Sequence, residues 1–163
     1  MLKYQFPAVK GKQAGKEYYI CMIPLGLLSK IFIIENGDVA PEHRAQRKLN
    51  ESRIPEISNY ILENRESYVF SALAASVDGE MHFVPYNSNS NIGVLEIDMG
   101  ASFLINDGQH RKAAIDAAIE EDETLKDETI SVVLYKDNGL TRSQQMFTDL
   151  NKHAVTTSKS FRL

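Results

Sequence analysis

The chain has 163 residues, of which 43% are apolar and 25% charged, and its formal net charge is −4. This length suits one domain, and the composition is that of an ordinary globular protein, which excludes the disordered, collagen-like and membrane-spanning classes. The longest apolar run, over residues 20–28, is far shorter than the roughly 20 residues that cross a bilayer. No secretory signal opens the chain, and a single cysteine excludes an internal disulfide. We therefore expect a cytoplasmic protein without a membrane partner, in which Cys21 is a buried thiol.

The charges are distributed unevenly along the chain. Residues 1–30 carry five lysines and one glutamate, and residues 129–163 carry five basic and two acidic residues. Residues 78–128 hold twelve acidic residues against three basic ones. The net charge argues against a uniformly basic nucleic-acid binder. A DNA-binding surface remains possible if the fold gathers the two basic ends on one face.

The N-terminal half is expected to begin with a hairpin and to continue with helices. Residues 4–9 and 18–24 are predicted to be two strands, joined by a turn rich in glycine and lysine. A short helix is expected to begin after Pro24. Further along, apolar residues recur every three or four positions, which predicts one helix before Ser52 and a second over 55–63.

The C-terminal half contains more strands. In chain order we expect an apolar segment over 68–77, strands over 81–86, 92–98 and 102–105, a helix over 112–121, a strand over 129–135 and a helix over 141–150. An Asp-Gly dipeptide after the first segment indicates a turn, and Ser or Thr is expected to cap the last helix. These elements predict an α+β fold, a small mixed β-sheet with packed helices, formed by the single domain 1–163.

Two expectations concern the predicted helix over 112–121. Its inner face is expected to consist of the following small or apolar residues: Ala113, Ala114, Ala117, Ala118 and Ile119. The acidic run over 120–123 opposes the helix dipole, so this end of the helix is expected to be solvated and to fray.

The residues between the strand over 102–105 and this helix form a candidate phosphate site. Gly108 lets a ligand approach the backbone, and the first N–H groups of the helix carry partial positive charge. Arg111 can hold two phosphate oxygens and His110 can donate one hydrogen bond. The alternative is structural: Asp107 caps the helix, Gly108 makes a tight turn and Arg111 pairs with a nearby carboxylate.

Other polar residues have two open interpretations. Asn151 either closes the same pocket from the end of the last helix or is the C-cap of that helix. Basic residues of the upstream helices form either a solvated face or a set of DNA phosphate contacts; they are Arg44, Arg47, Lys48 and Arg53. No metal site is expected, because His43, His82 and His153 share no ligand spacing.

Three segments resemble sequence motifs of a known family, and they occur along the chain in the same order as in that family. Asp107-Gly108-Gln109-His110-Arg111 is the signature of the DGQHR-domain family, to which the DndB-like proteins belong. Residues 146–154 resemble the family's downstream Phe-x-Asp-Leu-Asn segment, and residues 46–61 resemble its N-terminal helix pair. Together the three segments cover most of residues 44–160.

The resemblance implies a bacterial DNA-binding regulatory or accessory protein of a DNA phosphorothioate (sulfur) modification system. Such proteins act as negative transcriptional regulators, with DNA and other DNA modification proteins as partners. The family's fold is similar to that of ParB and sulfiredoxin, which bind nucleotide phosphates at the matching turn. ATP or another nucleotide with Mg²⁺ is therefore the implied ligand of Gly108, Gln109, His110, Arg111 and Asn151.

An enzyme is the alternative that the resemblance leaves open. A nucleotide-hydrolysing or DNA-nicking protein, such as a weak ATPase, would use Asp107 and His110 as catalytic residues. Sulfiredoxin-like reduction is not expected, because Gln109 stands where sulfiredoxin has its nucleophilic cysteine. Family members are generally longer, so the resemblance also predicts a C-terminal truncation or a short family member.

Overall fold

A computed structural model describes residues 2–32 and 51–160, with side chains described as far as Lys152. Its strands are β1 (Lys3–Gln13), β2 (Lys16–Pro24), β3 (Leu73–Asp78), β4 (Met81–Pro85), β5 (Ile92–Asp98), β6 (Ser102–Asp107) and β7 (Thr129–Lys136). Its α-helices are α1 (Leu25–Ile31), α2 (Arg53–Glu63), α3 (Gln109–Glu121) and α4 (Ser143–Ser160), and its short 3-10 helices are η2 (Glu123–Asp127) and η3 (Asn138–Leu140). The predicted α+β class is confirmed.

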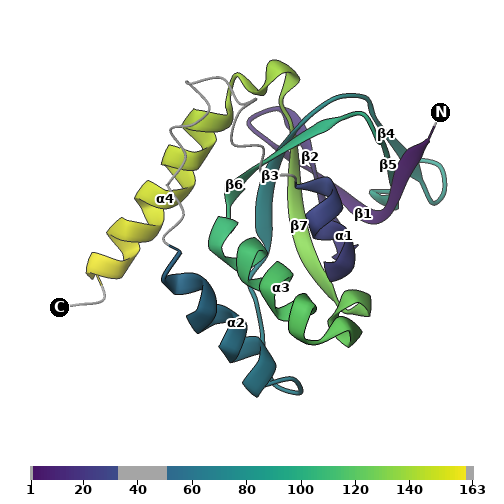
Figure 1. Cartoon of the computed structure of the whole chain (residues 1–163). Helices are drawn as coiled ribbons and strands as arrows, with labels where there is room; N and C mark the ends of the chain where they lie inside the picture. The colour runs from purple at the N-terminus through teal and green to yellow at the C-terminus, as the bar shows by residue number, and fades with distance from the viewer. Residues whose placement is uncertain (1, 33–50, 161–163) are drawn as a thin grey trace.

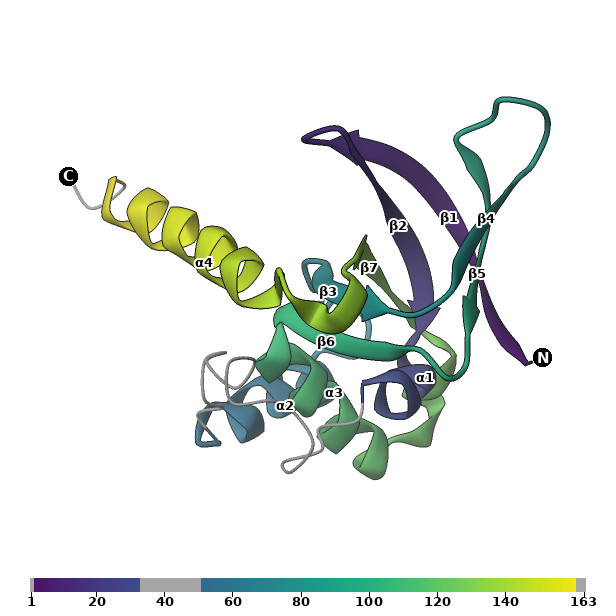
Figure 2. The same ribbon diagram turned by 90° about the horizontal axis from the view of Figure 1, so that it is seen from above.

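The seven strands form one mixed sheet in the order β4-β5-β1-β2-β7-β3-β6. Only the β3–β7 pair is parallel, and the other neighbours run antiparallel. β7, which is late in the chain, enters between β2 and β3 and joins the N-terminal hairpin to the strands that lead to the candidate turn. The sheet is strongly curved, with α1, α2 and α3 on one side and α4 on the other (Figures 1 and 2).

The core lies between the sheet and the helices α1 and α3. β2 shows why: Tyr19, Cys21 and Ile23 alternate with exposed residues and are all buried. Successive side chains of a strand point to opposite faces, so every second side chain of each central strand points into the core. Leu28 of α1 and Ile115 of α3 close this core from the other side, and both are fully buried.

Cys21 is 1% exposed, and burial raises the pKa of its thiol to about 12. Because the thiolate is the reactive form, we expect iodoacetamide to leave the native protein unmodified at pH 8 and to alkylate it fully in denaturant. Intact-mass spectrometry measures both reactions. Rapid alkylation of the native protein would contradict the buried position.

Several element boundaries differ from the predicted ones. β6 continues through Asp107 and α3 begins at Gln109, so the turn between them is a single residue. α4 extends to Ser160 instead of ending near residue 150. In the apolar segment 68–77 only the part from Leu73 onward is a strand. The helix predicted before Ser52 lies outside the described residues.

The inner face of α3 also differs from the predicted one. Ala114, Ile115 and Ala118 are fully buried, whereas Ala113 and Ala117 are only half-buried. Lys112 is buried as well, and its ammonium pairs with Asp116 at 2.7 Å. The prediction named five of the six apolar residues over 113–119 and left out Ile115, because so many neighbouring apolar positions fit two overlapping helical faces.

The acidic end of α3 is held in place, so the expectation that it frays was wrong. The Asp122 amide donates to Ala118 O at 2.9 Å, and the Asp122 carboxylate accepts from Thr124 N at 3.1 Å. Arg65, which follows α2, donates to Asp122 at 2.8 Å and to Glu128 at 3.0 Å. Tyr68 donates its hydroxyl proton to the same Glu128 carboxylate. The Arg65 guanidinium therefore offsets the unfavourable interaction between the acidic side chains and the C-terminal end of the helix dipole.

Because of these contacts, the free energy of unfolding is expected to fall at acid pH. The Tyr68 hydrogen bond and then Arg65 hold the pKa of the Glu128 carboxyl below its ordinary value of 4.5. A carboxyl with a lowered folded-state pKa stabilises the protein above the unfolded pKa, and this contribution is lost as pH falls through the folded pKa. We expect the free energy of unfolding, measured in urea, to decline from about pH 4.5 downward, modestly because the pair is exposed. Tyr68→Phe should weaken this decline, and an unchanged pH profile would contradict the assignment.

Candidate functional site

The candidate site begins at a one-residue turn between β6 and α3. Gly108 occupies this turn with φ 104° and ψ 20°, a left-handed conformation that favours glycine. A Cβ at this position would lie 2.4 Å from Leu73 Cδ2 and 2.8 Å from Arg111 Nη2. Glycine is therefore required both by the backbone conformation and by the space around it.

Asp107 is not the cap of α3, which corrects one part of the structural alternative. The N-cap of α3 is Gly108, which has no side chain to accept a hydrogen bond from the first turn of the helix. Asp107 belongs to β6, and its carboxylate lies 3.6 Å from the Arg111 guanidinium. The start of α3 carries the partial positive charge of a helix N-terminus.

Arg111 is held firmly beside this helix start. Its Nη2 donates to Ala72 O at 2.9 Å and faces Asp107 at 3.6 Å. Its Nε is buried and has no hydrogen-bond partner in the described part of the chain. The ion pair with a nearby carboxylate, which the structural alternative predicted, is thus present, but it leaves part of the guanidinium's donor capacity unused.

A pocket of about 240 Å³ lies in front of the turn. The signature segment forms its floor, α2 contributes Arg53 and Ile57, and α4 contributes Phe147 and Asn151. Residues of helices on opposite sides of the sheet therefore line one pocket. The structure brings Gly108, Gln109, His110, Arg111, Asn151 and Arg53 to one pocket. Arg44, Arg47 and Lys48 lie outside the described residues, so their predicted DNA contacts stay a prediction.

Asn151 lies in the middle of α4, so its interpretation as a helix C-cap was wrong. Its amide donates to Phe147 O at 2.7 Å, one turn earlier in the same helix. This bond holds the side chain against the helix at the wall of the pocket. Its predicted role in binding a ligand stays a prediction.

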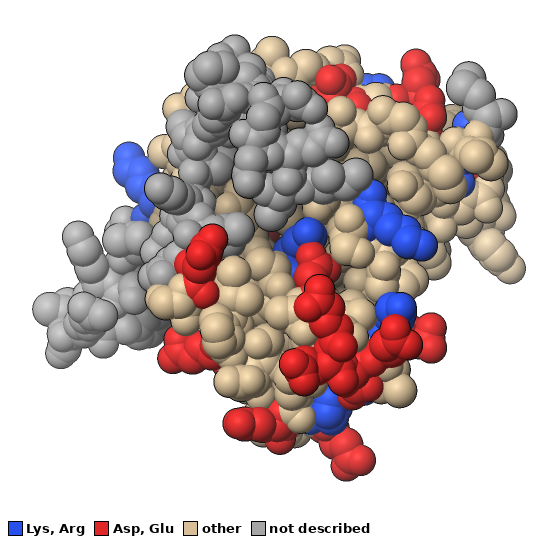
Figure 3. All heavy atoms as spheres, in the orientation of Figure 1, with Lys and Arg blue, Asp and Glu red and all other residues tan. Residues whose placement is uncertain are grey.

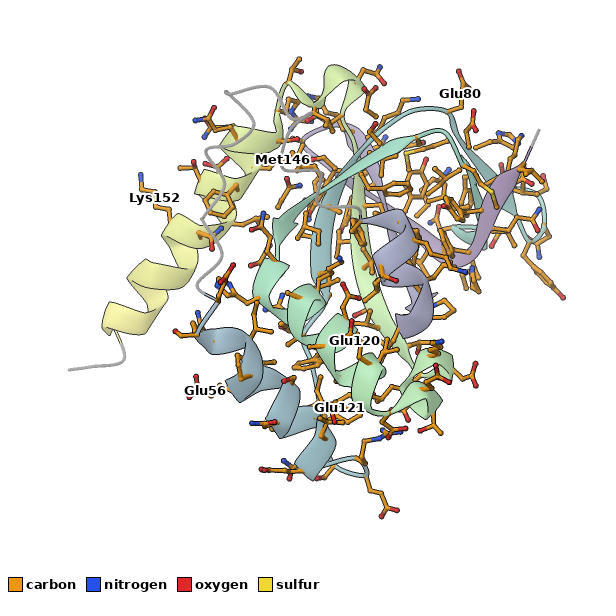
Figure 4. The ribbon with its side chains drawn as sticks, in the orientation of Figure 1. Glu56, Glu80, Glu120, Glu121, Met146 and Lys152 are labelled. Atoms are coloured by element: carbon orange, nitrogen blue, oxygen red, sulfur yellow. The ribbon has the colours of Figure 1, made fainter. Side chains whose placement is uncertain are left out.

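Sequence reasoning missed Asn106, a fully buried polar residue of the pocket. Its Nδ2 donates to Ser76 Oγ at 2.8 Å, and Ser76 Oγ lies 3.4 Å from Met146 Sδ. Figure 4 shows Met146 on the side of α4 that faces the sheet and Lys152 on the side turned away. The Asn106 Oδ1 atom is buried without a partner among the described residues. A polar residue at the end of an apolar strand, immediately before the signature, was the available signal.

The surface around the site has a marked charge division. Figure 3 shows acidic side chains gathered over α2 and over the far end of α3, away from the start of α3. Glu120, Glu121 and Glu123 are exposed members of this acidic surface. DNA phosphates would be repelled there, whereas Arg53 and Arg111 give the pocket end a positive charge.

A larger hollow of about 540 Å³ lies near the other end of the sheet, lined by Lys10, Tyr19 and Phe83 among others. It contains no residue of the signature. Within the described ranges, no group of three or more His, Cys, Asp or Glu side chains is arranged to hold a metal ion. None of the helices in that part of the chain is long and apolar enough to cross a membrane.

The fold and the pocket define a mixed α/β domain with a glycine turn and a cationic pocket at a helix N-terminus. The chain belongs to the DndB family, described as DNA-sulfur modification-associated, which it matches over residues 6–163. The resemblance drawn from the signature is therefore confirmed, as is a role in DNA sulfur modification at the level of the family. No curated protein and no solved structure matches the chain, so the likeness to ParB and sulfiredoxin stays a prediction.

Proposed function

We propose that this protein is a DNA-binding accessory protein of a DNA sulfur-modification system and a negative regulator of its transcription. The pocket at the signature turn is its phosphate-binding site. One observation carries the proposal: Arg53, His110 and Arg111 come from two helices to one pocket at the start of α3. Arginine side chains beside a helix N-terminus form a usual environment for a phosphate group.

The size of the pocket limits what it holds. At about 240 Å³ it is smaller than most small-molecule pockets, which begin near about 300 Å³. It accommodates one phosphate group with part of the attached sugar, and a DNA duplex can present only a backbone phosphate to it. ATP or a related nucleotide with Mg²⁺ would place a single phosphate group there and leave its base outside.

The test uses Arg53, which is exposed and lies at the mouth of the pocket. Arg53→Gln removes one positive charge without opening the core, so the thermal transition should not move. We expect weaker binding to promoter DNA in a mobility-shift titration, and a salt dependence with a slope smaller by about one phosphate contact. Lys126→Gln, the same charge change within the acidic surface, should leave DNA binding unchanged. Equal effects of the two variants would contradict a DNA contact at the pocket.

A second candidate function is nucleotide hydrolysis or DNA nicking at the same turn. The position of Asp107 favours it, because this carboxylate is 45% exposed at the pocket and does not cap α3. In this role Asp107 positions a metal ion or a water molecule, and His110 acts as acid or base. Phosphate release from ATP with Mg²⁺ that disappears in Asp107→Asn would support hydrolysis. A flat time course at high protein concentration would eliminate it.

Nucleotide binding can be measured separately by thermal shift with ATP, CTP and GTP, each with and without Mg²⁺. A ligand that binds only the folded state stabilises it by about 2.7 kcal/mol at a hundredfold excess over the dissociation constant. The His110→Ala/Arg111→Ala variant should fold and lose this shift. If the double variant fails to fold, the thermal shift with nucleotide is measured on Arg53→Gln instead. A shift equal to that of the wild type would place the nucleotide outside this pocket.

A further inference from the structure

Asn106 interrupts the regular pairing of β6 with β3. Asp107 pairs with Ala74 of β3. The next pair joins Ile105 to Ala75, so one residue of β6, Asn106, is extra. An extra residue of this kind is a β-bulge, which bends the strand and re-aims a side chain. Bulges are common beside functional sites, and this one lies directly before the candidate turn.

Two neighbours determine which way the Asn106 amide is turned. Its nitrogen, Nδ2, donates to Ser76 Oγ at 2.8 Å and to Met146 Sδ at 3.6 Å. Both Nδ2 protons therefore have an acceptor, whereas an amide oxygen in that place would face a thioether, which has no proton to donate. The amide therefore keeps Nδ2 toward β3 and α4 and turns its oxygen, Oδ1, the other way.

The Oδ1 end of the amide is the end that meets the pocket. Asn106 lines the pocket, whereas Ser76 and Met146, which hold Nδ2, are not among its described lining residues. Oδ1 is buried and accepts no hydrogen bond from any residue of the described ranges. Because Asn106 is 0% exposed, bulk water does not solvate this oxygen. A ligand group that donates to Oδ1 therefore adds a hydrogen bond without displacing one to water.

A buried acceptor in this pocket calls for a ligand group that carries a proton. The phosphate group that Arg53 and Arg111 are proposed to bind is ionised and presents acceptor oxygens, so it does not supply this proton. The pocket has about 240 Å³ of space, which leaves room for part of the attached sugar. A ribose hydroxyl can donate a hydrogen bond, and the sugars inside a DNA strand have no free hydroxyl.

We propose that Asn106 Oδ1 accepts a hydrogen bond from a ribose hydroxyl, so that Asn106 selects a ribonucleotide over a deoxyribonucleotide at this pocket. The inference rests on the proposed phosphate site and adds the class of ligand that this site prefers. Arg111 Nε, which is buried without an acceptor in the described part of the chain, supplies a donor from the same pocket wall. A site built to bind a hydroxyl rejects the analogue that lacks it, because a buried polar group then stays unpaired.

The test measures the affinities of ATP, CTP and GTP and of their 2′-deoxy and 3′-deoxy forms by calorimetry, with Mg²⁺ present. For the nucleotide that binds the wild type best, we expect one deoxy form to bind about tenfold more weakly, the effect of one hydrogen bond to a buried group. Asn106→Leu has a similar size but no acceptor, so it should lose this preference. Asn106→Asp keeps an oxygen acceptor, so it should retain the preference while its negative charge weakens the binding of every nucleotide.

Three results would overturn the inference. They are equal wild-type affinities for a ribonucleotide and both of its deoxy forms, a preference that Asn106→Leu leaves intact, and the absence of nucleotide binding by the wild type. If Asn106→Leu fails to fold, the wild-type comparison and Asn106→Asp decide, because a preference lost in Asn106→Asp would also contradict the role of Oδ1.

Arg53→Gln separates this inference from the phosphate site on which it rests. Arg53 lies at the same pocket, and its charge should attract the phosphates of ribonucleotides and deoxyribonucleotides alike. We therefore expect Arg53→Gln to weaken both by the same factor and to keep the preference of the wild type. Equal wild-type affinities together with this uniform loss would leave the phosphate site standing and remove only the recognition of the sugar. Affinities that Arg53→Gln does not change would remove the phosphate site itself.

Discussion

Gly108→Ala should lower the free energy of unfolding by about 2–4 kcal/mol, because it combines backbone strain with a steric clash. At φ 104° an L-residue is strained, and the added Cβ would meet Leu73 Cδ2 at 2.4 Å. Leu73 is fully buried at the start of β3, so it cannot move aside without opening the core. The same Cβ would displace Arg111, whose Nη2 would lie 2.8 Å away. Urea denaturation measures the loss of stability, and the nucleotide thermal shift measures the effect on the pocket.

Gly15→Ala is the matched control for this prediction. Gly15 has φ 75° in the β1–β2 turn, and nothing lies within 4 Å of a Cβ built there. It therefore carries the conformational cost alone, about 1–2 kcal/mol. The difference between the two variants isolates the steric contribution of the tightly packed turn. Equal losses in the two variants would show that Leu73 and Arg111 accommodate a methyl group.

Asp137→Ala should destabilise the protein by about 2–3 kcal/mol, the second largest effect. Asp137 follows β7 and is 3% exposed. Its carboxylate accepts from Arg142 N at 2.9 Å and from Ser143 Oγ at 3.0 Å, so it anchors the start of α4. Asp137 thereby performs the capping role that had been expected of a Ser or Thr. Its removal leaves a buried hydroxyl and a backbone N–H without an acceptor.

Asp149→Ala is the control, because it deletes an exposed carboxylate on the same helix and should change stability by less than about 0.5 kcal/mol. Asp137→Ala should also weaken ligand binding at the pocket, since α4 carries Phe147 and Asn151 into its wall. Denaturation curves and the nucleotide thermal shift separate the two effects. A variant that binds normally would show that α4 stays docked without its anchor.

Local patterns predicted most of the individual elements. The apolar runs of β2 and β7 and the three-to-four-residue spacing in α2 are each complete within one segment, so the local sequence alone identified these elements. The Asp78-Gly79 dipeptide and the signature glycine also act locally, because a turn requires a particular backbone conformation at one residue. The positions of Gly108, His110 and Arg111 at a helix start were therefore predictable from the sequence.

Element ends were less predictable, since they depend on partners that are distant in sequence. β6 extends through Asp107 because Asp107 pairs with Ala74 of β3. The acidic end of α3 is fixed by Arg65, which lies 57 residues earlier in the chain. A guanidinium brought there by the fold outweighs the unfavourable helix dipole that the local sequence indicates.

The sequence by itself determined the strand–turn–helix with its glycine and its cationic residues, and also the family to which the chain belongs. Only the tertiary structure decided that residues of α2 and α4 line a pocket at this turn and that Asn106 lies buried within it. The reason is physical: periodicity shows which residues of one segment share a face, whereas sheet order and helix packing decide what that face meets. β7 inserts between β2 and β3, and this long-range pairing places the N-terminal hairpin, the turn and α4 relative to one another.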